Sequence, residues 1–387
     1  MVAGFKSKKD RRAFFRAQAA QHGGTLSLSE QLSAKAKESF CVEENDGVYV
    51  DFPPSVSSWE ELPSIVDPGL YLPEERKLRK RAQLDYMCRA FAKLLYHLQK
   101  KNPSQSDDYV DGRSKKRLTA IDFCSGGRHL GLILAACFPE INVVCLERNP
   151  RNCERIEQRK AEGGLDNVQV MCADVADALT VQDFDIGVAI HACGWMTDFV
   201  QAICLQRKAS YVLCSCCVGK IAHPGPPESI KEYVMHPRSK RFQEKFTREE
   251  FLDMCKKADV DFYMDATLSG SNFDDDSFDL DAAAVSTNVA QVQTENANEN
   301  QNSSSIFQPD SQEKVKSSVD NGEDVCPPAS KSESKEVKDK IARRFCKTAV
   351  EVDRNAWSRE VGYETFLLMM PSWATPKNDI IIGYHKD

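Results

Sequence analysis

The strongest constraint on the fold is a regular alternation of short apolar runs and helical segments between Leu118 and Ser215. This spacing is typical of βα units, in which parallel strands form one sheet and helices cover both of its faces. The five predicted strands are 118–123, 143–147, 168–172, 184–190 and 209–214, and the predicted helices between them lie near 129–138, 150–162 and 196–206. The pattern therefore predicts an open α/β sheet.

The first of these strands ends in an acid and runs directly into the glycine-bearing turn Cys124-Ser125-Gly126-Gly127. Glycines let a ligand approach the backbone closely, and the following helix presents its N-terminal N–H groups to the same point. Asp122 lies in the first strand, Glu147 ends the second, and Asp174 follows the third. Because parallel strands end at one edge of a sheet, we expect these carboxylates to meet at one ligand. Glu147 alone could instead be a helix-capping acid.

Three such acids in series are typical of Rossmann-like methyltransferases, which hold S-adenosylmethionine with them. In that interpretation Glu147 accepts hydrogen bonds from both ribose hydroxyls, and Asp174 accepts one from the adenine amino group. Asp122 orders the turn or reaches the ammonium of the methionine end. The predicted cofactor-binding residues are therefore Asp122, Ser125, Gly126, Gly127, Glu147 and Asp174.

Two further segments follow the fourth and fifth strands, where an acceptor would meet the cofactor. His191 begins the string His191-Ala192-Cys193-Gly194 and is either a general base or a residue that shapes the pocket. The turn Cys214-Ser215-Cys216-Cys217 ends the fifth strand. Its cysteines could form a zinc site, completed by Cys193, His191 or His223, or supply a thiolate nucleophile. Simple packing at the substrate mouth is the favoured explanation, so no metal is expected.

Several strings resemble the methyltransferase-like region of the glutathione S-transferase C-terminal domain-containing protein family. They are Asp122-Phe123-Cys124-Ser125-Gly126-Gly127 with His129 and Gly131, Ile186-Gly187-Val188-Ala189 running into His191-Ala192-Cys193-Gly194, Cys216-Cys217 with Gly219, Asp353-Arg354 with Glu360 and Gly362-Tyr363, and Pro376-Lys377-Asn378. The basic helix carrying Arg76 to Gln83 is also similar. The resemblance spans roughly 60–270 and 341–387. It implies an S-adenosylmethionine-dependent methyltransferase within a group that includes tRNA ribose methyltransferases.

The resemblance also implies a Rossmann-like, seven-stranded methyltransferase sheet, mostly parallel, with a C-terminal antiparallel hairpin and helices on both faces. The hairpin strands are predicted at Tyr363 to Met370 and Asp379 to Tyr384, after a helix near 341–361. Cys216, Cys217, Lys377 and Asn378 are the expected substrate-side residues. The sequence departs from the general glycine motif at Cys124 and Arg128. Arg128 either pairs with the methionine carboxylate or crowds the pocket.

The domain organisation follows from changes in composition. Residues 1–73 are expected to form a basic tail, with a helix around Arg11 to Ala20 or no order, followed by an extended proline-rich segment. Residues 74–270 and 341–387 form the methyltransferase domain, in which a helix begins at Pro73. Residues 271–340 are rich in acidic and amide residues and poor in aromatic ones, so they predict a disordered acidic insert. The stretch before Leu118 is too short and proline-rich for the thioredoxin-like and transferase-like parts of the family, so glutathione chemistry is not expected.

Charge and cysteine usage limit partners and compartment. Residues 6–16 and 76–81 are basic and favour RNA as the acceptor, although no aromatic residues are interleaved with them as in RNA-binding signatures. No apolar run reaches the ~18 residues of a membrane span. Fifteen cysteines placed within strands and helices indicate a reducing compartment, either cytoplasm or nucleus. The rival hypothesis is a non-catalytic module that keeps the fold and binds a partner or only the cofactor.

Overall fold

The computed structural model describes most of the chain outside the two ends and the acidic segment. The described residues are 27–37, 48–49, 56, 58–101, 109–110, 113–114, 117–126, 130–179, 183–222, 226–268, 335–371 and 373–386. The predicted basic stretch 6–16, the alternative helix around Arg11 to Ala20 and residues 271–334 of the predicted insert lie outside these ranges.

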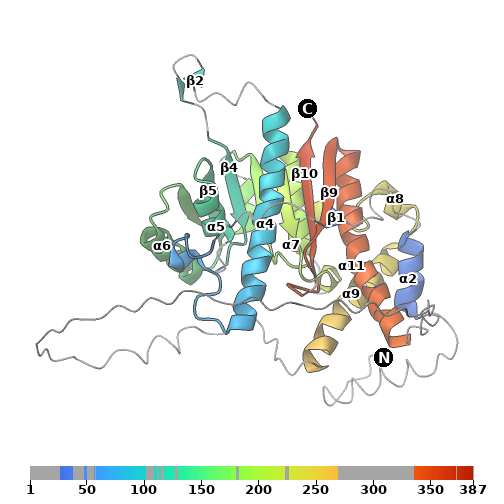
Figure 1. Ribbon diagram of the computed structural model, residues 1–387. Coiled ribbons are helices and arrows are strands. Elements are labelled where there is room, and N and C mark those ends of the chain that lie inside the picture. The colour runs from blue at the N-terminus through green and yellow to red at the C-terminus, as the bar shows by residue number, and fades with distance from the viewer. Residues whose placement is uncertain are drawn as a thin grey trace, which may run out of the picture. The chain divides into compact units, whose positions relative to one another are not determined.

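A mixed sheet forms the centre of the fold, with the strand order β1-β9-β10-β8-β7-β4-β5-β6 (Figure 1). Its strands are β1 (Val48–Tyr49), β4 (Thr119–Phe123), β5 (Asn142–Glu147), β6 (Val168–Cys172), β7 (Ile186–Ile190), β8 (Ser210–Cys214), β9 (Tyr363–Met369) and β10 (Asp379–His385). Only β10 runs antiparallel to its neighbours, β8 and β9. Seven of the strands have the predicted arrangement, and the two-residue β1 adds a parallel edge beside β9. A separate short hairpin pairs β2 (Tyr109–Val110) with β3 (Arg113–Ser114).

The strand order reverses between β4 and β7, which places a switch point at the centre of the sheet. From β4 the chain moves outward through β5 and β6, then returns to the other side of β4 for β7 and β8. In open parallel sheets, ligands bind beyond the carboxyl ends of the strands at such a point. The turn after β4 and the loop after β7 are therefore neighbours.

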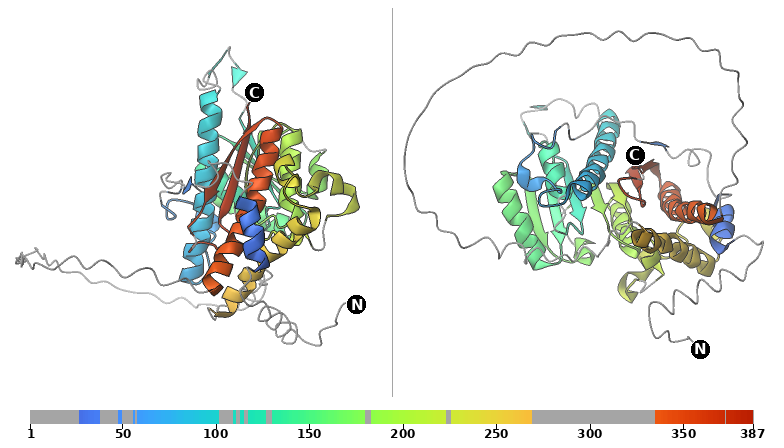
Figure 2. Two further views of the ribbon diagram at one scale, coloured as in Figure 1. Left: turned by 90° about the vertical axis from the view of Figure 1, so that its right-hand side faces the viewer. Right: turned by 60° about the horizontal axis from the view of Figure 1, so that its bottom comes forward.

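Two apolar cores lie on opposite faces of the sheet, because alternate residues of each strand point to opposite sides. Ala120 of β4 packs in the core of one face, under α4 (Glu74–Lys101), α5 (Leu130–Cys137) and α6 (Pro150–Gly163). Ile121 and Phe123 pack in the other core, with α7 (Trp195–Gln206), α9 (Arg248–Leu268) and α11 (Lys335–Glu360). Figure 2 shows α4 on one side of the strands and α9 with α11 on the other.

The helices near the sheet begin where local chemistry predicts. Helix α4 starts directly after Pro73, with Glu74 and Glu75 in its first turn, where the helix dipole favours acids. Pro150 occupies the first turn of α6, and the Asn149 side chain accepts a hydrogen bond from the Arg151 N–H at 3.1 Å. The buried residues of α4 recur at helical spacing and so lie on one face of the helix: Leu84, Met87, Cys88, Phe91, Leu94 and Leu95.

Two features differ from the sequence-based expectation. Helix α11 begins at Lys335, six residues before the predicted start at 341, so the described chain resumes inside the segment assigned to the insert. Helix α2 (Leu28–Lys37) is a folded part of the segment interpreted as a tail. It packs on α11, where Ser27 Oγ donates to Asp339 Oδ1 at 2.8 Å, and it reaches α9 through the Lys35–Glu250 ion pair at 2.8 Å. Both differences depend on contacts distant in the sequence.

Within the described ranges, no helix combines the length and the apolar character that a bilayer crossing requires. The cysteines of these ranges are all free thiols. Most of those in the strands and core helices are buried, as expected for cysteines that pack as small hydrophobic residues.

Candidate functional site

The acid of the first strand is buried and fixes the turn that follows it. Asp122 is 2% exposed, and its Oδ2 accepts a hydrogen bond from the N–H of Gly131, in the first turn of α5, at 2.9 Å. Ser125 Oγ donates to the Asp122 carbonyl oxygen at 2.7 Å. Burial raises the pKa of Asp122 to about 7, with a smaller contribution from the nearby charge of Glu147. Asp122 therefore orders the turn.

The backbone of this turn explains why the general motif places glycines here. Gly126 has a φ of 56°, and Cys124 has a φ of 58°, both in the left-handed region. Only glycine adopts that region without a steric cost of about 1–2 kcal/mol. The cysteine at the second position after Asp122 is therefore a strained departure from the motif. Gly127, Arg128 and His129 lie outside the described residues, so the predictions for Gly127 and Arg128 remain untested.

Glu147 connects the end of β5 to the same turn. Its Oε2 accepts a hydrogen bond from the Gly126 N–H at 2.7 Å, and its Oε1 accepts one from the Asn149 N–H at 2.7 Å. A carboxylate oxygen has two lone pairs. Each oxygen can therefore accept one further hydrogen bond, which suits a pair of vicinal hydroxyls. The backbone bonds hold the carboxylate in one orientation before any ligand arrives.

Asp174 lies at the end of β6 and is open to solvent, with half of its side chain exposed. Its Oδ1 accepts a hydrogen bond from the Ala176 N–H at 3.0 Å and so caps the short helix η3 (Val175–Leu179). Arg148 lies at 3.9 Å from its other oxygen. This capping hydrogen bond leaves the half-exposed carboxylate accessible to an amino group.

The Cys124 thiol lies near enough to the three carboxylates for their charges to act on it. Burial raises the pKa of this thiol to about 12, and the charges of Asp122, Glu147 and Asp174 raise it further in that order. Asp122 also lines a small cavity, together with Ser125, Gly126, Gly131, Leu132, Cys145 and Ile156, which has room for about one water molecule. Pockets for ligands of drug size usually measure about 300–1,000 Å³. The cavity is therefore far too small for a nucleoside-sized ligand.

The loop after β7 is joined to the loop after β8 by backbone hydrogen bonds. The His191 N–H donates to the Cys214 carbonyl at 3.0 Å, and the Gly194 N–H donates to the Cys217 carbonyl at 2.6 Å. His191 has a φ of 65°, and a Cβ at Gly194 would meet Lys220 Cβ at 2.6 Å. His191 is half-buried at the carboxyl end of β7. Its role as a base remains a prediction.

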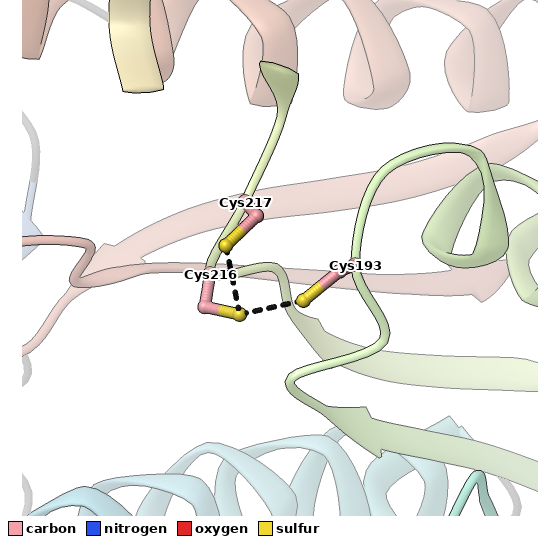
Figure 3. Close-up of side chains that lie close together, drawn as sticks. All are labelled: Cys193, Cys216 and Cys217. Atoms are coloured by element: carbon pink, nitrogen blue, oxygen red, sulfur yellow. Dashed lines mark hydrogen bonds between the residues drawn. The ribbon is translucent and has the colours of Figure 1, made fainter. Parts of the chain in front are cut away.

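Three cysteines from these two loops come together (Figure 3). Cys193 Sγ lies 2.8 Å from Cys216 Sγ, which lies 3.6 Å from Cys217 Sγ. Lys377, from the segment before β10, places its Nζ at 3.6 Å from Cys217 Sγ. The structure thus brings three of the expected substrate-side residues, Cys216, Cys217 and Lys377, into one cluster, to which Cys193 adds a third thiol. The pKa of Cys217 is lowered, first by the neighbouring thiols and then by Lys377 and Lys220.

Asn378 does not face this cluster. Its side-chain amide donates to the Met370 carbonyl and its oxygen accepts from Arg344, so both of its polar atoms close the turn that leads into β10. The side chain is 5% exposed. These hydrogen bonds give Asn378 a structural role, and its expected role toward a substrate stays a prediction.

A buried ionic network lies behind these loops, and the sequence analysis did not predict it. Arg354 of α11 donates through Nε and Nη2 to Asp198 of α7, with both distances at 2.8 Å. Its Nη1 donates to both oxygens of Glu351, and its Nη2 also donates to the Gly194 carbonyl at 3.2 Å. The only sequence signal was the string Asp353-Arg354 in the family resemblance. The network fixes the loop that carries Cys193.

The basic segment of α4 is partly neutralised by acids. Arg79 pairs with Glu75 at 2.8 Å, and Arg81 pairs with Asp67 at 2.6 Å. Lys77 lies 3.6 Å from Glu74. Part of the positive charge at 76–81 therefore compensates local acids, which leaves less of it for phosphate contacts.

Comparisons with known proteins agree with this architecture. Residues 79–224 match a family model described as a methyltransferase domain. The chain is 33% identical over 202 residues to a glutathione S-transferase C-terminal domain-containing protein of Xenopus laevis. The aligned region covers 52% of this chain and 28% of that protein. The protein of that name from Homo sapiens is 31% identical over 202 residues, with the same coverage, 52% of this chain and 28% of that protein. The chain thus spans less than a third of the length of these relatives.

Solved structures give more distant similarities. Coclaurine N-methyltransferase bound to N-methylheliamine and SAH is 16% identical, with a TM-score of 0.27, over 67% of this chain and 81% of that chain. Precorrin-6y C5,15-methyltransferase from Geobacter metallireducens is 19% identical, with a TM-score of 0.25, over 27% of this chain and 56% of that chain. The family resemblance inferred from the sequence is confirmed by the matched domain and the curated relatives. The fold class is confirmed by the strand order and the methyltransferase domain.

Proposed function

We propose that this chain is an S-adenosylmethionine-dependent methyltransferase whose cofactor site lies over the carboxyl ends of β4, β5 and β6. One observation carries the proposal: Asp122, Glu147 and Asp174 lie at the ends of three neighbouring parallel strands, and Glu147 and Asp122 accept backbone hydrogen bonds from the turn after β4 and from the helix that it enters. The methyltransferase domain matched over residues 79–224 supports the same conclusion.

The chemistry of these residues fits the cofactor. Glu147 would accept the two ribose hydroxyls with the lone pairs that its backbone hydrogen bonds leave available, and Asp174 would accept the adenine amino group. Asp122 and the turn through Gly126 would hold the methionine end. When bound, the cofactor supplies an electrophilic methyl group on a sulfonium.

The protein's contribution to the transfer would be mainly positional. An acceptor held over the ends of β7 and β8 would lie in line with the methyl–sulfur bond, which converts a bimolecular encounter into an oriented one. His191 would take the proton from a hydroxyl or amine acceptor. RNA is the acceptor class that the basic segments 6–16 and 76–81 favour, although acids pair with part of the second segment.

Calorimetry with S-adenosylmethionine and S-adenosylhomocysteine tests the cofactor site. Loss of a hydrogen bond to a charged group costs about 1.5–3 kcal/mol, so Asp174→Ala and Glu147→Gln should each raise Kd by about 10- to 100-fold. The control is Glu162→Ala, which removes an exposed carboxylate from α6 and should leave Kd unchanged. Absence of binding by the wild-type chain would overturn the proposal.

A tritiated-methyl transfer assay on total RNA and on protein extract tests activity and separates the acceptor classes. His191→Asn is the appropriate variant, because asparagine tolerates the left-handed backbone found at His191. Removal of a general base should lower kcat by about 10²- to 10⁴-fold while leaving the Kd of the cofactor unchanged. Tight cofactor binding with no transfer to either extract would instead support the non-catalytic module.

A further inference from the structure

We propose that Cys193, Cys216 and Cys217, here called the thiol cluster, bind one thiophilic cation, Zn²⁺ in the first place, through three thiolates. Cysteine thiolates are preferred ligands of Zn²⁺. The three Sγ atoms lie within 4.8 Å of one another, and they come from two loops that the sheet holds side by side. The proposal is independent of cofactor binding.

The distances within the thiol cluster suit a single central ion. Zn–S bonds of about 2.3 Å in a tetrahedral site place the sulfur atoms about 3.8 Å apart. The Cys216–Cys217 separation is 3.6 Å, and the Cys193–Cys216 separation is 2.8 Å. A disulfide bond measures about 2.05 Å, so Cys193 and Cys216 are not joined by one. A movement of about 1 Å by one side chain would accommodate the ion.

Nearby positive charge suits a cluster of thiolates. Three thiolates with one Zn²⁺ carry a net charge of −1, and the Lys377 ammonium lies 3.6 Å from Cys217 Sγ. Residues beyond the ligands commonly tune metal affinity in this way. Lys377 therefore has a role at the cluster that does not require contact with a substrate.

The frame around the thiol cluster is rigid. The Gly194 N–H donates to the Cys217 carbonyl, which joins the two loops beside the sulfur atoms. Buried Arg354 donates to the Gly194 carbonyl, and Ser215 donates to buried Glu351. A preorganised frame of this kind lowers the cost of assembling a metal site.

The position of the cluster indicates an open metal site. All three cysteines are half-buried at the carboxyl ends of β7 and β8. Zinc sites with three protein ligands leave a fourth position for water or a substrate. The fourth position here would face the edge of the sheet at which an acceptor is expected, so an acceptor atom could displace the water.

Metal content of the full chain is the first test. The protein is purified with a phosphine reductant, loaded with zinc, desalted and analysed by plasma mass spectrometry. We expect one zinc per chain in the wild type and in Cys172→Ser, which changes an exposed cysteine outside the cluster. Cys193→Ser, Cys216→Ser and Cys217→Ser should each lose at least nine-tenths of it. Retention of zinc by Cys193→Ser would overturn the proposal.

A second measurement avoids variants that fail to fold. Wild-type protein, zinc-loaded or chelator-treated, is alkylated with iodoacetamide and the labelled cysteines are mapped by mass spectrometry. Zinc should slow labelling of the three cluster cysteines at least tenfold and leave Cys172 unaffected. Lys377→Ala should weaken zinc binding by about 10- to 100-fold, and Lys377→Arg should retain most of it. Equal labelling with and without zinc would refute the site.

Discussion

Replacement of Arg354 by methionine tests whether the buried ionic network holds the two halves of the described domain together. Arg354 is fully buried and makes four hydrogen bonds to two carboxylates, those of Asp198 and Glu351, at 2.8–3.0 Å. It joins α11, which follows the acidic segment, to α7, which precedes it. Methionine has a similar length and no charge, so the variant removes the cation with little loss of volume.

Removal of one partner from a buried ion pair usually costs about 3–5 kcal/mol, because a charge remains buried without compensation. Here part of that penalty is relieved. Asp198 keeps His236 at 3.2 Å, and Glu351 keeps Lys347 at 2.8 Å. We therefore expect Arg354→Met to lower the free energy of unfolding by about 3 kcal/mol at pH 7, near the low end of that range.

The pH dependence supplies a second signature. Burial acts to raise the pKa of Asp198, but Arg354 and His236 outweigh it and hold the pKa below its usual value. A depressed folded-state pKa contributes stability above the unfolded-state value of about 3.9, and that stability is lost as the pH falls through the folded-state value. In the variant the pKa of Asp198 should rise. The destabilisation should therefore be largest at pH 7 and smaller at pH 3.

Urea unfolding at both pH values provides the measurement. The control is Arg207→Met, whose pair with Asp183 at 3.0 Å is near the surface, with Asp183 89% exposed. Such pairs contribute about 0–1 kcal/mol. If Arg354→Met cost no more than this control and showed no pH dependence, the proposed importance of the network would be refuted.

Three further predictions concern the turn after β4 and the strand beside it. Burial raises the pKa of Asp122 to about 7, so the folded state holds a proton that the unfolded chain releases above about pH 4. Relative to Asp122→Asn, the wild-type chain should therefore lose about 2–3 kcal/mol of stability between pH 5 and pH 7. If urea unfolding gave the same difference in stability between wild type and variant at both pH values, this prediction would be contradicted. Cys124→Gly should raise the free energy of unfolding by about 1 kcal/mol, because glycine adopts the left-handed backbone at this position without steric strain. Cys124→Ala should give no such gain when both variants are unfolded with urea. A Cβ at Gly187 would lie 2.4 Å from Cys204 Sγ, so Gly187→Ala should cost about 1–3 kcal/mol, and an unchanged melting temperature would show that the sheet adjusts freely there.

The elements of the fold were largely predictable from local pattern. Apolar runs and helical periods gave strands whose ends lie within about two residues of those observed, because burial on both faces of a parallel sheet requires continuous apolar strands. The Asn149 cap with Pro150 also followed from local chemistry. The acids at the strand ends could be placed at one edge, since parallel strands share a direction and consecutive βα units have a fixed hand.

Other features depended on contacts that no local pattern records. The packing of α2 on α11 joins Ser27 to Asp339, which are 312 residues apart, and the network joins Asp198 to Arg354, which are 156 residues apart. The sequence suggested Cys193 as one candidate partner for the Cys214–Cys217 turn, but only the crossing of the loops after β7 and β8 decided that its thiol meets Cys216.

By itself, then, the sequence determined the order of the strands and helices and the chemical character of the sheet edge, because both follow from spacing along the backbone. The tertiary structure decided which side chains meet at that edge and how their charges are compensated. The reason is that side-chain contacts between distant segments depend on the packing of whole elements, and that packing is not a property of any short stretch of chain.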